Sequence, residues 1–143
     1  RNIIGKVDLI QSVDSLILAK KIDSISERNS ICTNILIEVN IGGEANKFGV
    51  SADKLHDTIF EISKLKNIKI CGLMTVLPIC NDSCRIKEYF MQMHKIFIDI
   101  KEKTIDNVSM DYLSMGMSSD YIEAIECGAN MVRIGSAIFG SRV

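Results

Sequence analysis

Two polar stretches near the end of the chain carry residue types that bind anions. The segment MVRIGSAIFGS (Met131–Ser141) places a Gly-Ser pair, Gly135 and Ser136, directly after an apolar run. The segment MGMSSD (Met115–Asp120) adds the hydroxyl of Ser118. Backbone N–H groups that open a helical turn, together with serine hydroxyls, are donors suited to a phosphate. A tight glycine turn with two helix-capping serines explains the same spacing equally well.

Arg133 interrupts the apolar run that precedes this Gly-Ser pair. An unpaired buried charge costs several kcal/mol. Either Arg133 has an anionic or acceptor partner inside the fold, or its segment is not buried. A salt bridge to Asp8, Asp111 or another carboxylate is the purely structural explanation.

Composition excludes several classes of protein. At 143 residues the chain is expected to form one domain. Its 47% apolar and 24% charged residues are those of an ordinary globular protein. The net charge of −1 gives no indication of a nucleic-acid or membrane-surface partner. No apolar run is long enough to span a bilayer, and the first residues do not have the pattern of a signal peptide.

The cysteines favour reduced thiols and a cytoplasmic location. There are five, an odd number, and three of them lie inside apolar stretches. Cys80 and Cys84 have a CxxxC spacing, but no second pair completes a tetrahedral set, and His94 lies ten residues further on in a predicted helix. We therefore expect no metal site. His56 and His94 lie on predicted amphipathic helices and are expected at the surface.

Short strands and amphipathic helices alternate along the chain. The predicted strands are Val7–Val13, Asn34–Ile41, Ile68–Val76, Met110–Met117 and Met131–Ile134. Apolar residues at helical spacing between them span Leu18–Ile25, Leu55–Ile62, Ile86–Ile100 and Ile122–Ile125.

This alternation predicts a parallel sheet. The short fourth helix is expected to begin with Ser118 or Ser119 as its N-cap and to end at Gly128. The sheet is either an open doubly wound sheet or part of a closed eight-stranded barrel. Both architectures place ligands outside the carboxyl ends of the strands, where the Gly-Ser pair and Ser118 are found.

Four segments resemble a known family. YLSMGMSSDYIEAIECGANMVRIGSAIFGSR (Tyr112–Arg142) is similar to the C-terminal signature of the pyridoxal phosphate homeostasis proteins, the YggS/PROSC group. Ile10–Ser15, Val39–Val50 and Ile70–Pro78 match the preceding segments of that family in the same order. The resemblance implies a (β/α)8 (TIM) barrel of the alanine-racemase type, which holds pyridoxal 5′-phosphate (PLP) as an internal Schiff base.

The chain also departs from this family. The segment VSKT, which carries the cofactor lysine on the first strand, has no counterpart here, and neither do FGEN and IGxLQxNK. We therefore expect residues 1–143 to be the C-terminal portion of one PLP-binding barrel, strands four to eight with their helices. The Schiff-base lysine would then lie outside this chain, no catalytic residue would be present, and covalent PLP binding would be impaired.

The resemblance assigns roles to five residues. Ser118, Gly135 and Ser136 would contact the cofactor phosphate. Arg133 would face the pyridine nitrogen. A guanidinium cannot accept a proton, so it keeps that nitrogen unprotonated and weakens the ring as an electron sink. Met74 would line the cofactor pocket, although a core methionine is the alternative.

By the same resemblance, the whole protein would be a cytoplasmic, monomeric PLP carrier. It would buffer the cofactor or deliver it to PLP-dependent enzymes, without established catalysis. The alternative is the barrel domain of a PLP-dependent amino-acid racemase, which needs two bases. One base is the cofactor lysine and the other a tyrosine from a β-rich domain, and neither is found here. Lys47 follows a strand, but its K-x-G pattern is not the family's anchor, so we expect it to be solvated or to order its loop.

Overall fold

A curved sheet of parallel strands forms the centre of the molecule. The computed structural model describes residues 3–44, 47–80 and 82–140. Within them the strand order is β1-β2-β4-β5-β6, and β3 pairs with β2 beside this path. The strands are β1 (Ile10–Val13), β2 (Thr33–Asn40), β3 (Val50–Ser51), β4 (Ile68–Met74), β5 (Val108–Met117) and β6 (Met131–Arg133).

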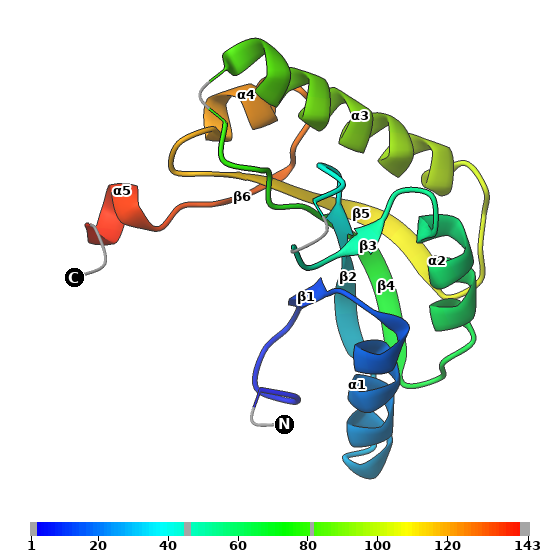
Figure 1. The fold of residues 1–143 in the computed structure, drawn as a ribbon. Coiled ribbons are helices and arrows are strands. Elements are labelled where there is room, and N and C mark those ends of the chain that lie inside the picture. Colours follow the sequence, from blue (N-terminus) through cyan, green and yellow to red (C-terminus); the bar gives the residue numbers. More distant parts are fainter. Residues whose placement is uncertain (1–2, 45–46, 81, 141–143) are drawn as a thin grey trace.

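Four helices lie along the outer side of this curve, as Figure 1 shows. Each connects one strand to the next parallel strand, which is the arrangement that a parallel sheet requires. They are α1 (Leu16–Arg28), α2 (Leu55–Ser63), α3 (Ser83–Lys101) and α4 (Tyr121–Glu126), and a short α5 (Ser136–Phe139) follows β6. A doubly wound sheet would carry helices on both faces, so the expected partial (β/α)8 barrel is confirmed.

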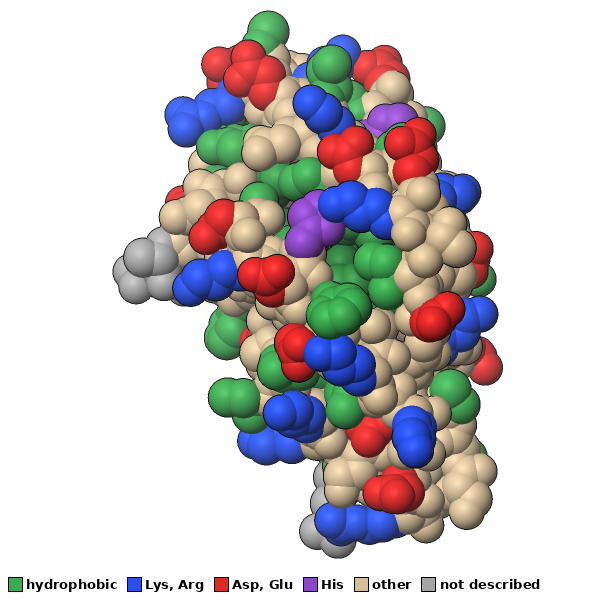
Figure 2. Space-filling view, turned by 90° about the vertical axis from the view of Figure 1, so that its right-hand side faces the viewer, with side chains coloured by type: hydrophobic (Ala, Val, Ile, Leu, Met, Phe, Trp, Pro, Cys, Tyr) green, Lys and Arg blue, Asp and Glu red, His purple; other side chains and the backbone are tan. Residues whose placement is uncertain are grey.

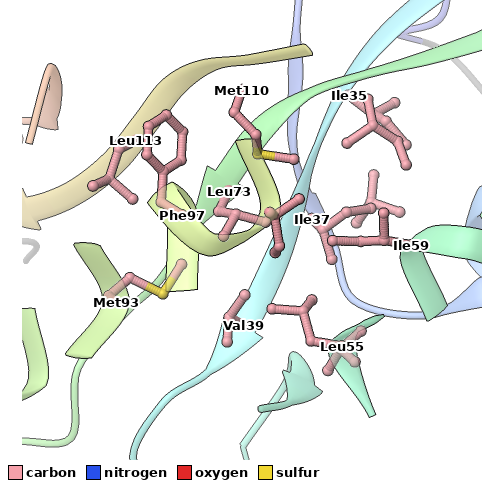
Figure 3. Packing of buried hydrophobic residues seen from close by; sticks show 14 of the residues in the cluster. Ile35, Ile37, Val39, Leu55, Ile59, Leu73, Met93, Phe97, Met110 and Leu113 are labelled. Carbon is pink, nitrogen blue, oxygen red and sulfur yellow. The ribbon is translucent and has the colours of Figure 1, made fainter. Parts of the chain in front are cut away.

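The two faces of the sheet have different compositions. Ile35 and Ile37 of β2 are buried against the helices, in the larger apolar cluster drawn in Figure 3. Burying one such side chain stabilises the fold by about 1.5–3 kcal/mol. Leu36 points to the opposite, concave face, where it forms a small cluster with Cys71 and Met74. Most of the apolar packing therefore lies between sheet and helices.

The predicted strands agree with the structure except at their ends. The first begins at Ile10 rather than Val7, because its pairing with β2 begins with Ile10 and Ile35. Residues 3–6 form a turn in which Lys6 N–H donates to Ile3 O at 2.9 Å. The two-residue β3 was not predicted. It aligns Val50 with Val39 of β2.

Charges of both signs are interspersed on the outer surface. On the face seen in Figure 2, Lys and Arg side chains are interspersed with Asp and Glu, and hydrophobic side chains show between them. This pattern is typical of solvated helix faces rather than of a surface with charge of a single sign. None of the described helices is long and apolar enough to cross a membrane.

Candidate functional site

Arg133 lies at the end of β6 and extends across the carboxyl ends of β5 and β4. Its Nη1 donates to Ser114 Oγ at 2.7 Å, and its Nη2 donates to the carbonyl oxygen of Thr75 at 2.8 Å. Among the described residues no carboxylate lies within ion-pair distance, so the salt bridge to Asp8 or Asp111 is not formed. Arg133 is half-buried, and its partners are neutral oxygen atoms.

Burial is the main influence on the charge of Arg133. It lowers the pKa of the guanidinium, while the nearby carboxylates of Asp120 and Glu38 raise it. Arginine remains protonated in proteins even so. The carboxyl ends of the strands therefore hold a fixed positive charge. Each terminal nitrogen of the guanidinium uses one N–H in the hydrogen bond to Ser114 or Thr75.

Glu38 lies on β2 and points to the same concave face. Burial raises the pKa of its carboxyl group, Asp14 raises it further, and Arg133 lowers it. The net shift is upward, so the folded state binds this proton more tightly than the unfolded state does. This contribution to the stability of the folded state is fully present below the ordinary pKa of a glutamate and is lost as the pH rises through the raised pKa of the folded state.

We therefore expect Glu38→Gln to increase stability more at pH 7 than at pH 4. The amide does not titrate, so the variant does not undergo this loss. Urea unfolding of parent and variant at the two pH values measures the difference. Glu27→Gln, at an exposed position on α1, serves as the control. If Glu38→Gln raised the free energy of unfolding equally at both pH values, or less at pH 7, the raised pKa of Glu38 in the folded state would be contradicted.

Ser118 joins the loop after β5 to the turn after β6. Its Oγ accepts the backbone N–H of Gly135 at 3.1 Å and that of Ala137 at 3.3 Å. Two backbone donors thus converge on one oxygen atom. We call Ser118 and residues 135–137 the donor turn. The structure brings Ser118, Gly135 and Ser136 together.

The N-cap of α4 differs from the prediction. The helix begins at Tyr121, and its N-cap is Asp120 rather than Ser118 or Ser119. Asp120 is buried, and its Oδ1 accepts the N–H of Met117 at 2.6 Å. Its carboxylate thereby holds the loop after β5 closed. This arrangement leaves the Ser118 hydroxyl available to the donor turn.

Open space adjoins the donor turn at Gly135. A Cβ added at this position would meet no atom within 4 Å, and both Gly135 and Ser136 are exposed. The glycine is therefore not required by close packing against a neighbour. Its missing side chain leaves room for another group to approach the backbone.

Met74 lies at the end of β4, in register with Ser114 of β5. It is 4% exposed and packs with Leu36 and Cys71 on the concave face. It therefore adjoins the residue that holds Arg133, and its side chain is part of the small apolar cluster.

Among the described residues, none of the remaining candidates forms a hydrogen bond with Arg133. Lys47 Nζ donates to Leu77 O at 3.3 Å and pairs with Glu44 Oε2 at 2.9 Å, which agrees with a role in ordering its loop. His56 is exposed near Lys103. The described cysteines are free thiols, Cys80 and Cys84 included. Across the described residues, no three His, Cys, Asp or Glu side chains are grouped closely enough to hold a metal ion.

His94 differs from the expectation of a surface histidine. It is half-buried, and its imidazole lies against Gly128, where an added Cβ would come within 2.9 Å of the ring. The ring occupies the space that the missing side chain leaves beside the end of α4.

Sequence reasoning missed the residues that support Arg133. Ser114, Thr75 and Gln11 are not among the predicted site residues, although all three are polar residues within predicted strands. Ser114 is fully buried, and its Oγ donates to Gln11 Oε1 at 2.7 Å. A polar residue at an inward position of a strand was the available signal.

These features define the class of protein: a half-barrel of parallel α/β units with a positive charge and a donor turn at the carboxyl ends of its last strands. The family model described as "Alanine racemase, N-terminal domain" matches residues 2–143. The chain belongs to this family.

Relatives of known name cover the whole chain. It is 39% identical over 140 residues to the pyridoxal phosphate homeostasis protein of Aquifex aeolicus, a match of 98% of this chain and 60% of that protein. It is 35% identical over 143 residues to the protein of the same name from Synechocystis, with 100% and 65% covered. The chain therefore spans about three fifths of the length of these two relatives.

Solved structures share the fold. The crystal structure of an unknown protein from Bifidobacterium adolescentis superposes with a TM-score of 0.90 at 36% sequence identity, over 96% of this chain and 56% of that one. The structure of PipY from Synechococcus elongatus with PLP bound has a TM-score of 0.84 at 26% sequence identity. The match covers 96% of this chain and 63% of PipY. Alanine racemase from Corynebacterium glutamicum has a TM-score of 0.73 at 15% sequence identity, over 99% of this chain and 39% of the racemase. At this identity the two proteins are alike in fold alone.

Proposed function

We propose that this chain binds pyridoxal 5′-phosphate and forms the phosphate-binding and ring-binding part of a (β/α)8 barrel. The observation that carries the proposal is the Arg133 guanidinium, fixed by Ser114 and Thr75 at the same end of the sheet as the donor turn. Relatives named for PLP homeostasis and the PLP-bound structure of PipY support it.

The residues present fit this cofactor. In the proposed arrangement Ser118, Gly135 and Ser136 bind the phosphate beside the open space at Gly135. A phosphate oxygen would replace Ser118 Oγ as the acceptor of the Gly135 and Ala137 N–H groups, and the freed Ser118 hydroxyl would donate to the phosphate. Arg133 faces the pyridine nitrogen and leaves it unprotonated, since a guanidinium only donates. Met74 borders the ring. PLP itself supplies a reactive aldehyde and an electron-accepting ring, and an unprotonated ring is the weaker acceptor.

For the whole protein we propose cofactor homeostasis rather than catalysis. In this role it would hold PLP, limit its condensation with amines, and deliver it to PLP-dependent enzymes in the cytoplasm as a monomer. The second candidate is the barrel domain of an amino-acid racemase, which the family description favours. The relatives at 35–39% identity carry the homeostasis name, whereas the racemase structure is 15% identical. D-alanine formed from L-alanine and PLP by the chain, above the amount in a protein-free control, would favour the racemase candidate, because a homeostasis protein has no need of the two bases that racemisation requires.

Calorimetric titration of the chain with PLP and with pyridoxal tests the binding proposal. We expect one PLP per chain and an affinity for pyridoxal at least about tenfold lower, because pyridoxal lacks the phosphate that the donor turn binds. Equal affinities, or no binding of PLP, would overturn the proposal.

Gly135→Val should lower PLP affinity about tenfold or more. Its side chain enters the open space beside the donor turn, where the phosphate is proposed to lie. The free energy of unfolding should change by less than about 1 kcal/mol, because no neighbour lies within 4 Å of the new Cβ. Ile138→Val, an exposed position on α5, is the control. Unchanged PLP affinity in a folded Gly135→Val chain would place the phosphate elsewhere.

A further inference from the structure

Ser114 occupies a position that determines how Arg133 is presented. It is fully buried on β5, and its Oγ lies 2.7 Å from Arg133 Nη1 and 2.7 Å from Gln11 Oε1. A guanidinium only donates, so the single proton of the hydroxyl must go to Gln11. The direction of the chain is therefore fixed, from Arg133 through Ser114 to the carbonyl oxygen of the Gln11 side chain.

This hydrogen-bond chain crosses the concave face. Gln11 lies on β1 and Ser114 on β5, and β2 and β4 lie between them in the sheet. Side chains so far apart in strand order meet only because the sheet curves. The orientation of Arg133 on β6 thus depends on a residue of the opposite outer strand, with which β6 shares no backbone pairing.

Nη2, the second terminal nitrogen of Arg133, also has a fixed acceptor. Its acceptor is the Thr75 carbonyl, and Thr75 is anchored on both sides. Its N–H donates to Ser114 O at 3.1 Å, and its Oγ1 donates to Val39 O at 2.7 Å. Two fixed acceptors define the plane of the guanidinium, whereas one would allow it to rotate.

We propose that Ser114 and Gln11 are positioning residues for Arg133. They hold the guanidinium so that its free N–H donors face the ligand, and they act on the ligand only through Arg133. The proposal rests on the PLP-binding role and adds two residues to its site. Hydrogen bonds in series polarise one another, so the Gln11 end contributes to the strength of the Arg133 donor.

The first measurement uses the chain without PLP. In Ser114→Ala and in Gln11→Leu, the NMR signals of the Arg133 guanidinium should shift and broaden, because one of its two anchors is lost or weakened. Ser12→Ala, an exposed neighbour of Gln11 on β1, should leave them unchanged. Unchanged Arg133 signals in both variants would overturn the positioning role, whatever the parent chain binds.

The second measurement is the PLP affinity of the same variants. Ser114→Ala should weaken binding about tenfold, in the range of one hydrogen bond to a charged group. In an Arg133→Leu background the same substitution should have no further effect, because Ser114 acts through Arg133. An equal loss in both backgrounds would show a general structural role and overturn the proposal. Failure of the parent to bind PLP overturns the proposed function instead, and the NMR result still decides the role of Ser114 and Gln11.

Discussion

Replacing Arg133 with leucine should reduce PLP affinity between about tenfold and about a hundredfold. The substitution removes the guanidinium that faces the ring nitrogen in the proposed site, and a hydrogen bond from a charged donor contributes about 1.5–3 kcal/mol. It also leaves the acceptors Ser114 Oγ and Thr75 O without their donor. Calorimetric titration measures the affinity, and thermal unfolding shows whether the variant is folded.

Arg133→Lys provides the matched control. It keeps the charge, but an ammonium is a point donor that cannot hold the planar, two-acceptor geometry. We expect an intermediate loss. Parental affinity in a folded Arg133→Leu chain would remove Arg133 from the binding site and with it the role proposed for Ser114.

Gly72→Ala should destabilise the chain by about 3 kcal/mol or more. Gly72 lies in β4 with φ +151°, and an added Cβ would come within 1.9 Å of the Tyr112 carbonyl oxygen. This oxygen belongs to the backbone of β5 and cannot move without breaking the pairing of the two strands. Because natural domains have only about 5–15 kcal/mol of stability, much of the margin would be lost.

Gly128→Ala is the informative comparison for this prediction. Its φ is also positive, at +95°, but the added Cβ meets the imidazole of His94 at 2.9 Å rather than a backbone atom. A side chain can shift, so we expect a smaller loss of about 1 kcal/mol, mainly from the backbone conformation. Urea unfolding followed by circular dichroism measures both variants. Equal losses would show that the contact with β5 is not the cause.

The alternation of strands and helices predicts a parallel sheet because the strands carry a strong signal, whereas the choice of a partial barrel over a doubly wound sheet comes from the family resemblance. Branched apolar residues such as Ile35 and Ile37 mark β2, and helical spacing marks the helices between the strands. The rule that ligands lie beyond the carboxyl ends of parallel strands directs attention to Ser118, Gly135 and Ser136, which the structure places together at that end of the sheet. The two residues of β3 are too few to show any periodicity.

The supports of the site could not be predicted in the same way. The partners of Arg133 are a serine hydroxyl and a backbone carbonyl, and a carbonyl is present at every residue. Gln11 and Ser114 are separated by 103 positions, and only the curvature of the sheet brings them together. The N-cap of α4 is Asp120, and the two serines that precede it are equally good N-caps by residue type. Only the local backbone geometry decides which of the three residues caps the helix.

Amide NMR spectra of the ¹⁵N-labelled chain, recorded with and without PLP, test the central claim most directly. We predict that the largest shifts fall on the backbone amides of Gly135, Ser136 and Ala137 and on the side chain of Arg133. Shifts centred on the loop of Lys47, or a covalent adduct on Lys47 after borohydride reduction, would contradict the account. The cofactor would then lie at the loop between β2 and β3, and the role assigned to the donor turn would be wrong.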